Sequence, residues 1–291
     1  MSEKNIRITT DCVCDLPKEY LKNYDIDVIY FYINTSKGRF RDGSEISSMN
    51  VLEYLINGGT KAISEAPTVE DYIAFFSDNI EKCDELIHIT ITSELSCSYE
   101  NAVKAAELMG DKGQAIHVVD SKSLSTSIGV LVIKANEMQK AGATWHEICN
   151  ELNEMSSHIS TSFITVNTNY LYRNGRVSKN INNICSALRA HPVLTLKNGQ
   201  IYLKNIRFGN YEKAIRRYIK GELKDKNSIN KKRVFITHSG CSMKELTAIK
   251  EYVESRCDFE EIIVTMASAT ISCNCGPKAL GVIFSKYYEP K

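Results

Sequence analysis

Residues 85–106, ELIHITITSELSCSYENAVKAA, combine three structural signals in one short stretch of the chain. An apolar run rich in β-branched residues predicts a buried strand. A turn rich in Thr and Ser follows it, and small apolar residues at helical spacing then predict a helix. A strand that feeds directly into a helix is typical of α/β folds.

The turn in this stretch has two interpretations. The first backbone N–H groups of a helix lack internal partners and lie at the positive end of its dipole, which favours a bound carboxylate or phosphate. Hydroxyl groups of Thr92, Ser93, Ser96 and Ser98 can complete such an anion site. Serine and threonine are equally ordinary helix N-caps that need no ligand, so the turn alone does not decide.

Strand-like and helix-like segments alternate on both sides of the turn. The apolar runs lie near Ile8, from Asp27 (DVIYFYI), from Glu85 and from Ala115. Helical patterns lie between or after them, at residues 49–56, 69–83, 98–109 and 128–139. This alternation predicts a largely parallel sheet with helices on both faces.

The pattern changes after a helix expected from Thr144, which pairs with Glu147 as a capping box, to about Ser157. Short strands are then expected from Ser162, Pro192 and Ile201, with a hairpin turn at residues 197–200. The last expected elements are a helix at 211–223, a polar linker at 224–232, a strand from Arg233 and a helix capped by Ser242 and Glu245. We expect two domains: residues 1–160, with the parallel sheet and the hydroxyl-rich turn, and residues 161–291, with a mixed or antiparallel sheet.

Composition excludes several classes of function. The chain has 291 residues, 43% of them apolar, with 36 Lys and Arg against 35 Asp and Glu. A net charge of +1 provides no global field for nucleic acid or an anionic membrane. No apolar run approaches the roughly 20 residues of a membrane span, and the N-terminus lacks the apolar centre of a signal peptide. We expect a cytoplasmic protein with no nucleic-acid partner and no stable membrane insertion.

The ten cysteines do not have the spacing of a structural zinc site. They include two C-x-C pairs, Cys12 with Cys14 and Cys273 with Cys275. A chain of this length can bury enough apolar surface without disulfides, and reduced buried cysteine commonly acts as a small hydrophobe. We expect neither a metal nor a cofactor.

Four turns at strand ends are candidate ligand sites, because ligands of open α/β sheets bind beyond the carboxyl ends of the strands. They are residues 9–17, 92–98, 118–126 and 267–281. Arg176 and Arg207, each next to a glycine, are basic partners available for an anion. The common hydrolase, nucleotide-binding and zinc-protease motifs are absent, which favours binding over bond cleavage.

In their order along the chain these turns resemble motifs of the DegV family, fatty-acid-binding proteins related in fold to a domain of dihydroxyacetone kinase. The family motif D-S-T-x-D-L-P is matched by residues 11–17, and S-S-x-L-S-G-T-Y is matched by residues 92–99. Further matches lie at residues 63–68, 120–121, 170–178, 204–209 and 274–281. The resemblance covers nearly the whole chain and implies a two-domain DegV-like α/β fold.

The resemblance also implies a function: one long-chain fatty acid held in a narrow apolar tunnel between two domains, with its carboxylate at the hydroxyl cluster. By position, Ser96 should contact the carboxylate, with Ser64 as the second hydroxyl and Ser93 nearby. Asn274 stands where the family has a histidine and can hydrogen-bond a carboxylate. On this reading the protein is a lipid-binding protein and not an enzyme.

Some family members present the bound acid to a fatty acid kinase subunit, with an arginine and a histidine near the head group. Arg207 matches that arginine. Asn274 cannot carry a proton at neutral pH, so support for phosphotransfer is weakened. Lys278 replaces a motif glycine and can restore a positive charge, at the cost of strain if the position needs a positive φ.

Cysteines also replace small residues of the family motifs, at Cys12 and Cys97. With Cys273 and Cys275, we expect at least two of the four to lie close together at the pocket mouth. Two other functions stay open: an acyl hydrolase or transferase with Ser96 or Cys97 as nucleophile, and a regulatory module that has lost its ligand.

Overall fold

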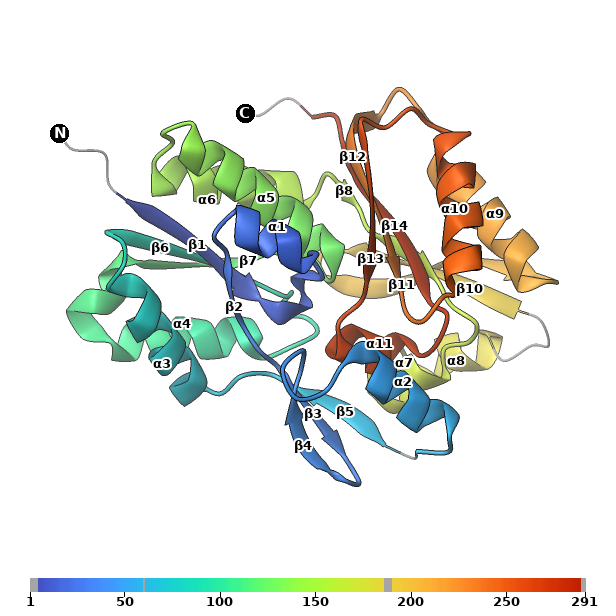
Figure 1. Cartoon of the computed structure of the whole chain (residues 1–291), viewed down its shortest axis with the longest axis horizontal. Coiled ribbons are helices and arrows are strands. Elements are labelled where there is room, and N and C mark those ends of the chain that lie inside the picture. The colour runs from blue at the N-terminus through green and yellow to red at the C-terminus, as the bar shows by residue number, and fades with distance from the viewer. Residues whose placement is uncertain (1–4, 60, 186–189, 289–291) are drawn as a thin grey trace.

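A four-stranded parallel sheet forms the core of the first half of the chain (Figure 1). The computed structural model describes residues 5–59, 61–185 and 190–288. The sheet has the order β2-β1-β6-β7, with β1 at Ile6–Asp11, β2 at Asp27–Ile29, β6 at Glu85–Thr90 and β7 at Ile116–Asp120. All six residues of β6 are buried, as expected for a strand covered on both faces.

Helices cover both faces of this sheet, as the sequence predicts. On one face, Leu86 packs with Tyr72 and Phe76 of α3 (Val69–Ile80) and with the alanines of α4 (Ser98–Leu108). On the other face, Ile87 and Ile89 pack against α5 (Thr126–Lys140) and α6 (Trp145–Ser156). Two short 3₁₀ turns, η1 (Cys12–Cys14) and η2 (Gly110–Ala115), and helix α1 (Lys18–Asn23) complete this half.

A mixed sheet forms the core of the second half of the chain, as the sequence predicts. Its order is β11-β10-β9-β14-β12-β13, with β8 beside β14; only β12 and β13 pair in parallel. The strands are β8 (Ile159–Ser160), β9 (Ser162–Ile164), β10 (Ala190–Lys197), β11 (Gln200–Phe208), β12 (Ile229–His238), β13 (Glu261–Met266) and β14 (Leu280–Lys286). Helices α9 (Tyr211–Glu222) and α10 (Met243–Glu254) cover its outer face (Figure 1).

Helix α5 lies between the two sheets. Its Ile128 and Leu131 belong to one apolar cluster that includes Ile87 of the parallel sheet and Phe235 and Ile283 of the mixed sheet. Helix α5 also contacts β14 directly. One helix therefore contributes to the packing of both sheets.

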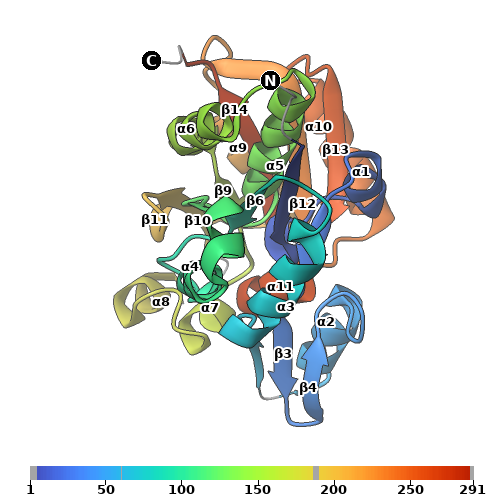
Figure 2. The same cartoon turned by 90° about the vertical axis from the view of Figure 1, so that its left-hand side faces the viewer.

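A third, antiparallel sheet of order β4-β3-β5 extends below the other two (Figure 2). Its strands are β3 (Tyr32–Thr35), β4 (Gly38–Arg41) and β5 (Ala62–Glu65). Helix α2 (Ser48–Ile56) and helix α11 (Ala269–Cys275) pack beside it, and α7 (Asn169–Arg173) contacts α11. Helix α8 (Lys179–Cys185) precedes β10.

Two sequence expectations about these elements were wrong. The single strand expected from Asp27 is two strands in different sheets, because β2 ends at Ile29 and β3 pairs antiparallel with β4 and β5. The stretch at residues 267–281, expected as a turn, contains helix α11. Its N-terminal N–H groups are held by the carboxylate of Asp42, which is distant in sequence.

Other local expectations are confirmed. Thr144 with Glu147 and Ser242 with Glu245 both form capping boxes. The expected hairpin joins β10 to β11, and Asn198 and Gly199 both have positive φ. The linker expected at residues 224–232 is shorter, because Ile229 is buried and already pairs with Lys286. The division into two domains near residue 160 stays a prediction.

Candidate functional site

A cavity of about 470 Å³ lies between the carboxyl ends of the parallel strands and the mixed sheet. Its size is within the range of small-molecule sites, roughly 300–1,000 Å³. Phe31, Ile91 and Leu124 line it from the segments that follow β2, β6 and β7. The remaining lining residues are Ser64, Glu65, Ala66, Glu94, Leu95, Ser96, Cys97, Phe163, Leu171, Arg176, Ile201, Thr270, Ile271, Asn274 and Cys275.

The cavity adjoins a smaller recess of about 40 Å³, which the loop after β7 and the strands of the mixed sheet line. The two share Leu124, Phe163, Ile271 and Cys275 as lining residues, so they lie next to each other. Ile283 and Leu280 of β14 line the far part of the recess. The surface of the recess is largely apolar, whereas hydroxyl, amide and guanidinium groups line the larger cavity.

Ser96 lies in the turn between β6 and α4 and lines the cavity. Its Oγ accepts a hydrogen bond from the backbone N–H of Ser98 at 3.2 Å. Because the oxygen acts as the acceptor in that bond, the hydroxyl hydrogen of Ser96 is available to donate to an anion.

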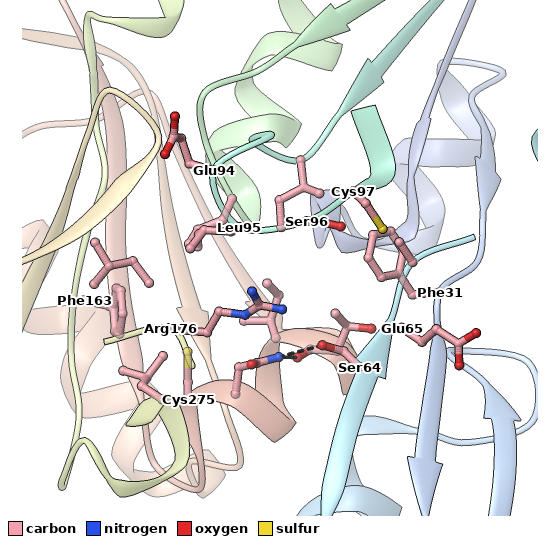
Figure 3. A pocket seen from close by; sticks show the side chains of 18 residues that line it. Phe31, Ser64, Glu65, Glu94, Leu95, Ser96, Cys97, Phe163, Arg176 and Cys275 are labelled. Carbon is pink, nitrogen blue, oxygen red and sulfur yellow. Dashed lines mark hydrogen bonds between the residues drawn. The ribbon is translucent and has the colours of Figure 1, made fainter. Parts of the chain in front are cut away.

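Ser64 reaches the same cavity from β5. Its Oγ accepts from Asn274 Nδ2 at 3.0 Å, and this amide nitrogen also donates to the Thr270 carbonyl at 2.8 Å (Figure 3). Because this oxygen is the acceptor, the hydroxyl hydrogen of Ser64 can be donated to an anion or to the neighbouring Cys273 thiol. Ser96, Ser64 and Asn274 were all predicted from the sequence, and all three line one cavity.

Arg176 supplies a positive charge to this end of the cavity. It follows α7 after a turn in which Gly175 has a φ of +70°, and its guanidinium extends between Ser96 and Ser64 (Figure 3). Burial lowers the pKa of Arg176 from its usual value. The structure gives it no ion pair within residues 5–59, 61–185 and 190–288.

The two carboxylates that line the cavity, Glu65 and Glu94, bond to residues other than Arg176. Glu65 accepts from Asn34 at 2.6 Å and pairs with Arg39 at 3.1 Å, and Glu94 accepts from Gln200 at 2.6 Å. Figure 3 shows both carboxylates turned away from Arg176. This part of the cavity therefore combines two hydroxyl donors with a guanidinium that has no ion pair among the described residues, a set suited to a carboxylate.

Three other residues predicted for the site lie outside the cavity lining. Ser93 donates its hydroxyl to Asp120 at 2.7 Å. Arg207 lies against α9, where a Cβ added to Gly221 would be 3.2 Å from its Nη2. Lys278 has a φ of +62°, so this position does have the positive φ that strains a lysine, and its side chain pairs with Glu245 at 2.8 Å.

Of the four cysteines considered together, Cys97 and Cys275 line the cavity. Burial raises the pKa of Cys275 to about 12 and raises that of Cys273 and Cys12. These thiols are therefore protonated at neutral pH. Within the part of the chain that the structure describes, no group of three or more His, Cys, Asp or Glu side chains is placed to hold a metal ion.

The surroundings of Ser96 lack the parts of a nucleophile site. Among the described residues its Oγ has one hydrogen-bond partner, the Ser98 N–H, and neither a histidine nor a carboxylate hydrogen-bonds to it. A serine nucleophile needs an adjacent general base.

No helix of the described residues combines the length and apolarity needed to cross a bilayer.

The chain is similar to known proteins over nearly its whole length. The model of a family described as uncharacterised protein, DegV family, matches residues 5–287. A DegV domain-containing protein of Caldanaerobacter subterraneus subsp. tengcongensis is 29% identical over 283 residues, covering 97% of this chain and 99% of its own length.

Two solved structures are also similar. A DegV family protein from Thermus thermophilus, described for its fatty acid binding, has a TM-score of 0.86 at 23% identity and covers 97% and 100% of the two chains. A protein from Thermotoga maritima whose structure is described as revealing a fatty acid binding function has a TM-score of 0.83 at 25% identity, covering 97% and 99%. These likenesses confirm the predicted α/β fold, with a parallel sheet followed by a mixed sheet.

Proposed function

The chain belongs to the DegV family, and from that premise we propose that it binds a single long-chain fatty acid in the cavity between its parallel sheet and its mixed sheet. The hydrocarbon lies toward the apolar recess, and the carboxylate lies among Ser96, Ser64 and Arg176. The observation that carries this proposal is the Arg176 guanidinium, which has no ion pair among the described residues and extends between two serine hydroxyls in a cavity that also has apolar walls.

The energetics of the two ends support this orientation. Each methylene group that leaves water contributes about 0.8 kcal/mol, so the apolar part provides most of the affinity for a long acyl chain. A buried charge without a partner is unfavourable, and a carboxylate would pair with Arg176 while it accepts from both hydroxyls. The carboxylate end therefore fixes the orientation of the ligand.

Presentation of the bound acid to a fatty acid kinase subunit is the finer part of the proposal. It rests on the family resemblance. Asn274, which lines the cavity, cannot act as an acid or a base. Asn274 itself therefore contributes no proton transfer to phosphorylation of the acid.

The direct experiment is mass spectrometry of a lipid extract from the purified protein, which should contain a long-chain fatty acid in a ratio near one per chain. Arg176→Gln should weaken the binding of hexadecanoic acid by about tenfold to hundredfold, the loss expected for a hydrogen bond to a charged group. Arg207→Gln is the matched control and should bind like the wild type.

Two results would contradict the proposal. One is equal affinity for hexadecanoic acid in the two arginine variants and the wild type. The other is hydrolysis of a simple acyl ester by the wild type that Ser96→Ala abolishes, which would make the protein a hydrolase.

A further inference from the structure

The loop that carries Ser96 has no regular secondary structure of its own. It runs from Ile91, after β6, to Cys97, before α4, and presents Leu95, Ser96 and Cys97 to the cavity. Because a bound carboxylate needs a donor at a defined point, something outside the loop must fix its two ends.

Asp11, at the carboxyl end of β1, contacts both ends of this loop. Its Oδ2 accepts from the Ile91 N–H at 2.8 Å and from the Ser98 hydroxyl at 2.7 Å. Its Oδ1 accepts from Tyr72 at 2.7 Å and lies 3.3 Å from His88 Nε2. The side chain of Asp11 is fully buried, so these contacts are shielded from water.

The contact with Ser98 continues to the ligand site. The Ser98 hydroxyl bonds to Asp11, while the Ser98 backbone N–H donates to Ser96 Oγ at 3.2 Å. That N–H determines which lone pair of Ser96 is occupied and hence where its hydrogen can point. Fixing the first residue of α4 therefore also fixes the donor direction of Ser96.

We propose that Asp11 is a positioning residue that acts through Ser98 and Ile91 to hold the Ser96 hydroxyl toward the ligand carboxylate. This inference rests on the proposed fatty acid binding and extends it to a side chain that does not touch the ligand. Tyr72 and His88 stabilise the buried carboxylate from the α3 face of the sheet, and the two loop contacts transmit its position to the site.

The test compares two deletions of one buried hydroxyl from this cluster. Ser98→Ala removes the hydroxyl that contacts Asp11 and Tyr72, but it keeps the backbone N–H of residue 98 and the contact of Asp11 with the Ile91 N–H. Thr9→Val is the matched control, because the Thr9 hydroxyl lies 3.0 Å from His88 Nδ1 and does not reach the loop. Asp11→Asn is the direct variant, and Ser98→Ala keeps the proposal testable if that variant does not fold.

Affinity for hexadecanoic acid, measured by titration, should fall about fivefold in Ser98→Ala, the value of one net hydrogen bond, and stay at the wild-type level in Thr9→Val. In a Ser96→Ala background, adding Ser98→Ala should have no further effect, because the hydroxyl that it positions is gone.

Equal weakening by Ser98→Ala and Thr9→Val would overturn the inference, as would a full Ser98→Ala effect in the Ser96→Ala background. Both results concern a protein that still binds the acid. A wild type that does not bind hexadecanoic acid at all would instead refute the proposed function, and this inference with it.

Discussion

Asp15 is a buried carboxylate that joins three distant segments. It has a φ of +52° after η1, and it accepts from Ser125 Oγ at 2.5 Å and from the Ser268 N–H at 2.8 Å. Burial raises the pKa of Asp15 to about 7, although these hydrogen bonds oppose the rise. The side chain therefore retains a proton at pH values where an exposed aspartate is ionised.

This shift predicts a specific pH dependence of stability. The unfolded chain has an aspartate pKa near 3.8 and the folded chain one near 7, so only the folded state holds the proton between these values. The stabilisation from Asp15 is complete below about pH 4, falls as the pH rises toward 7, and is lost above it.

Asp15→Asn should raise the melting temperature relative to wild type at pH 8, because the amide keeps an acceptor for Ser268 and carries no charge. Melting curves between pH 4 and 8 measure the difference between variant and wild type. The exposed Asp258→Asn is the control. A variant less stable than the wild type at pH 8 would contradict the prediction.

At the ligand site, the sequence motifs located the serines but did not decide which arginine joins them. Ser96 lies in the turn that ends parallel strand β6, at the edge where ligands of such sheets bind, and Ser64 was located by the resemblance of residues 63–68 to a family motif. Arg176 and Arg207 each stand beside a glycine in a basic motif. Only the turn at Gly175 and the packing of Arg207 on α9 distinguish them, and both depend on tertiary structure.

At the scale of elements, the sequence predicted the helices that have a capping box or a periodic apolar face. It did not predict helix α11. Helix α11 has seven residues, ATISCNC, with too few turns to show a periodic apolar face. The carboxylate of Asp42 stabilises it by accepting from Ala269 and Thr270 at 3.0 and 2.8 Å. Its local signals, Ser268 at the N-cap and Gly276 after its last residue, do not by themselves distinguish a short helix from a turn.

The close approach of α5 to η1 gives a prediction at this scale. A Cβ on Gly129 would lie 2.7 Å from Leu16 Cδ2 and 3.0 Å from the Cys14 carbonyl oxygen. Gly129→Ala should therefore lower the free energy of unfolding by about 1–2 kcal/mol, because overpacking exceeds the gain in helix propensity.

Urea denaturation of Gly129→Ala beside Gly221→Ala would check this. Gly221 is an exposed residue of α9, and a Cβ there meets only the end of the Arg207 side chain. It should be neutral or stabilising by up to about 1 kcal/mol. Two variants of equal stability would show that α5 can move away from η1.

At the scale of the whole molecule, a ligand between the sheets should stabilise the fold. A ligand at one hundred times its Kd contributes about 2.7 kcal/mol to the free energy of unfolding. Protein stripped of lipid should thus melt several degrees higher when hexadecanoic acid is added. Hexadecanol, which lacks the carboxylate, should give a smaller shift, and equal shifts would argue against a role for Arg176.

The position of α5 between the sheets also has a consequence for synthesis. When the ribosome has made residues 1–160, α5 can pack on the parallel sheet, but Phe235, Ile263 and Ile283, which cover its other side, have not yet been translated. The apolar side of α5 therefore stays in contact with water or a chaperone until the residues of β12, β13 and β14 have been translated.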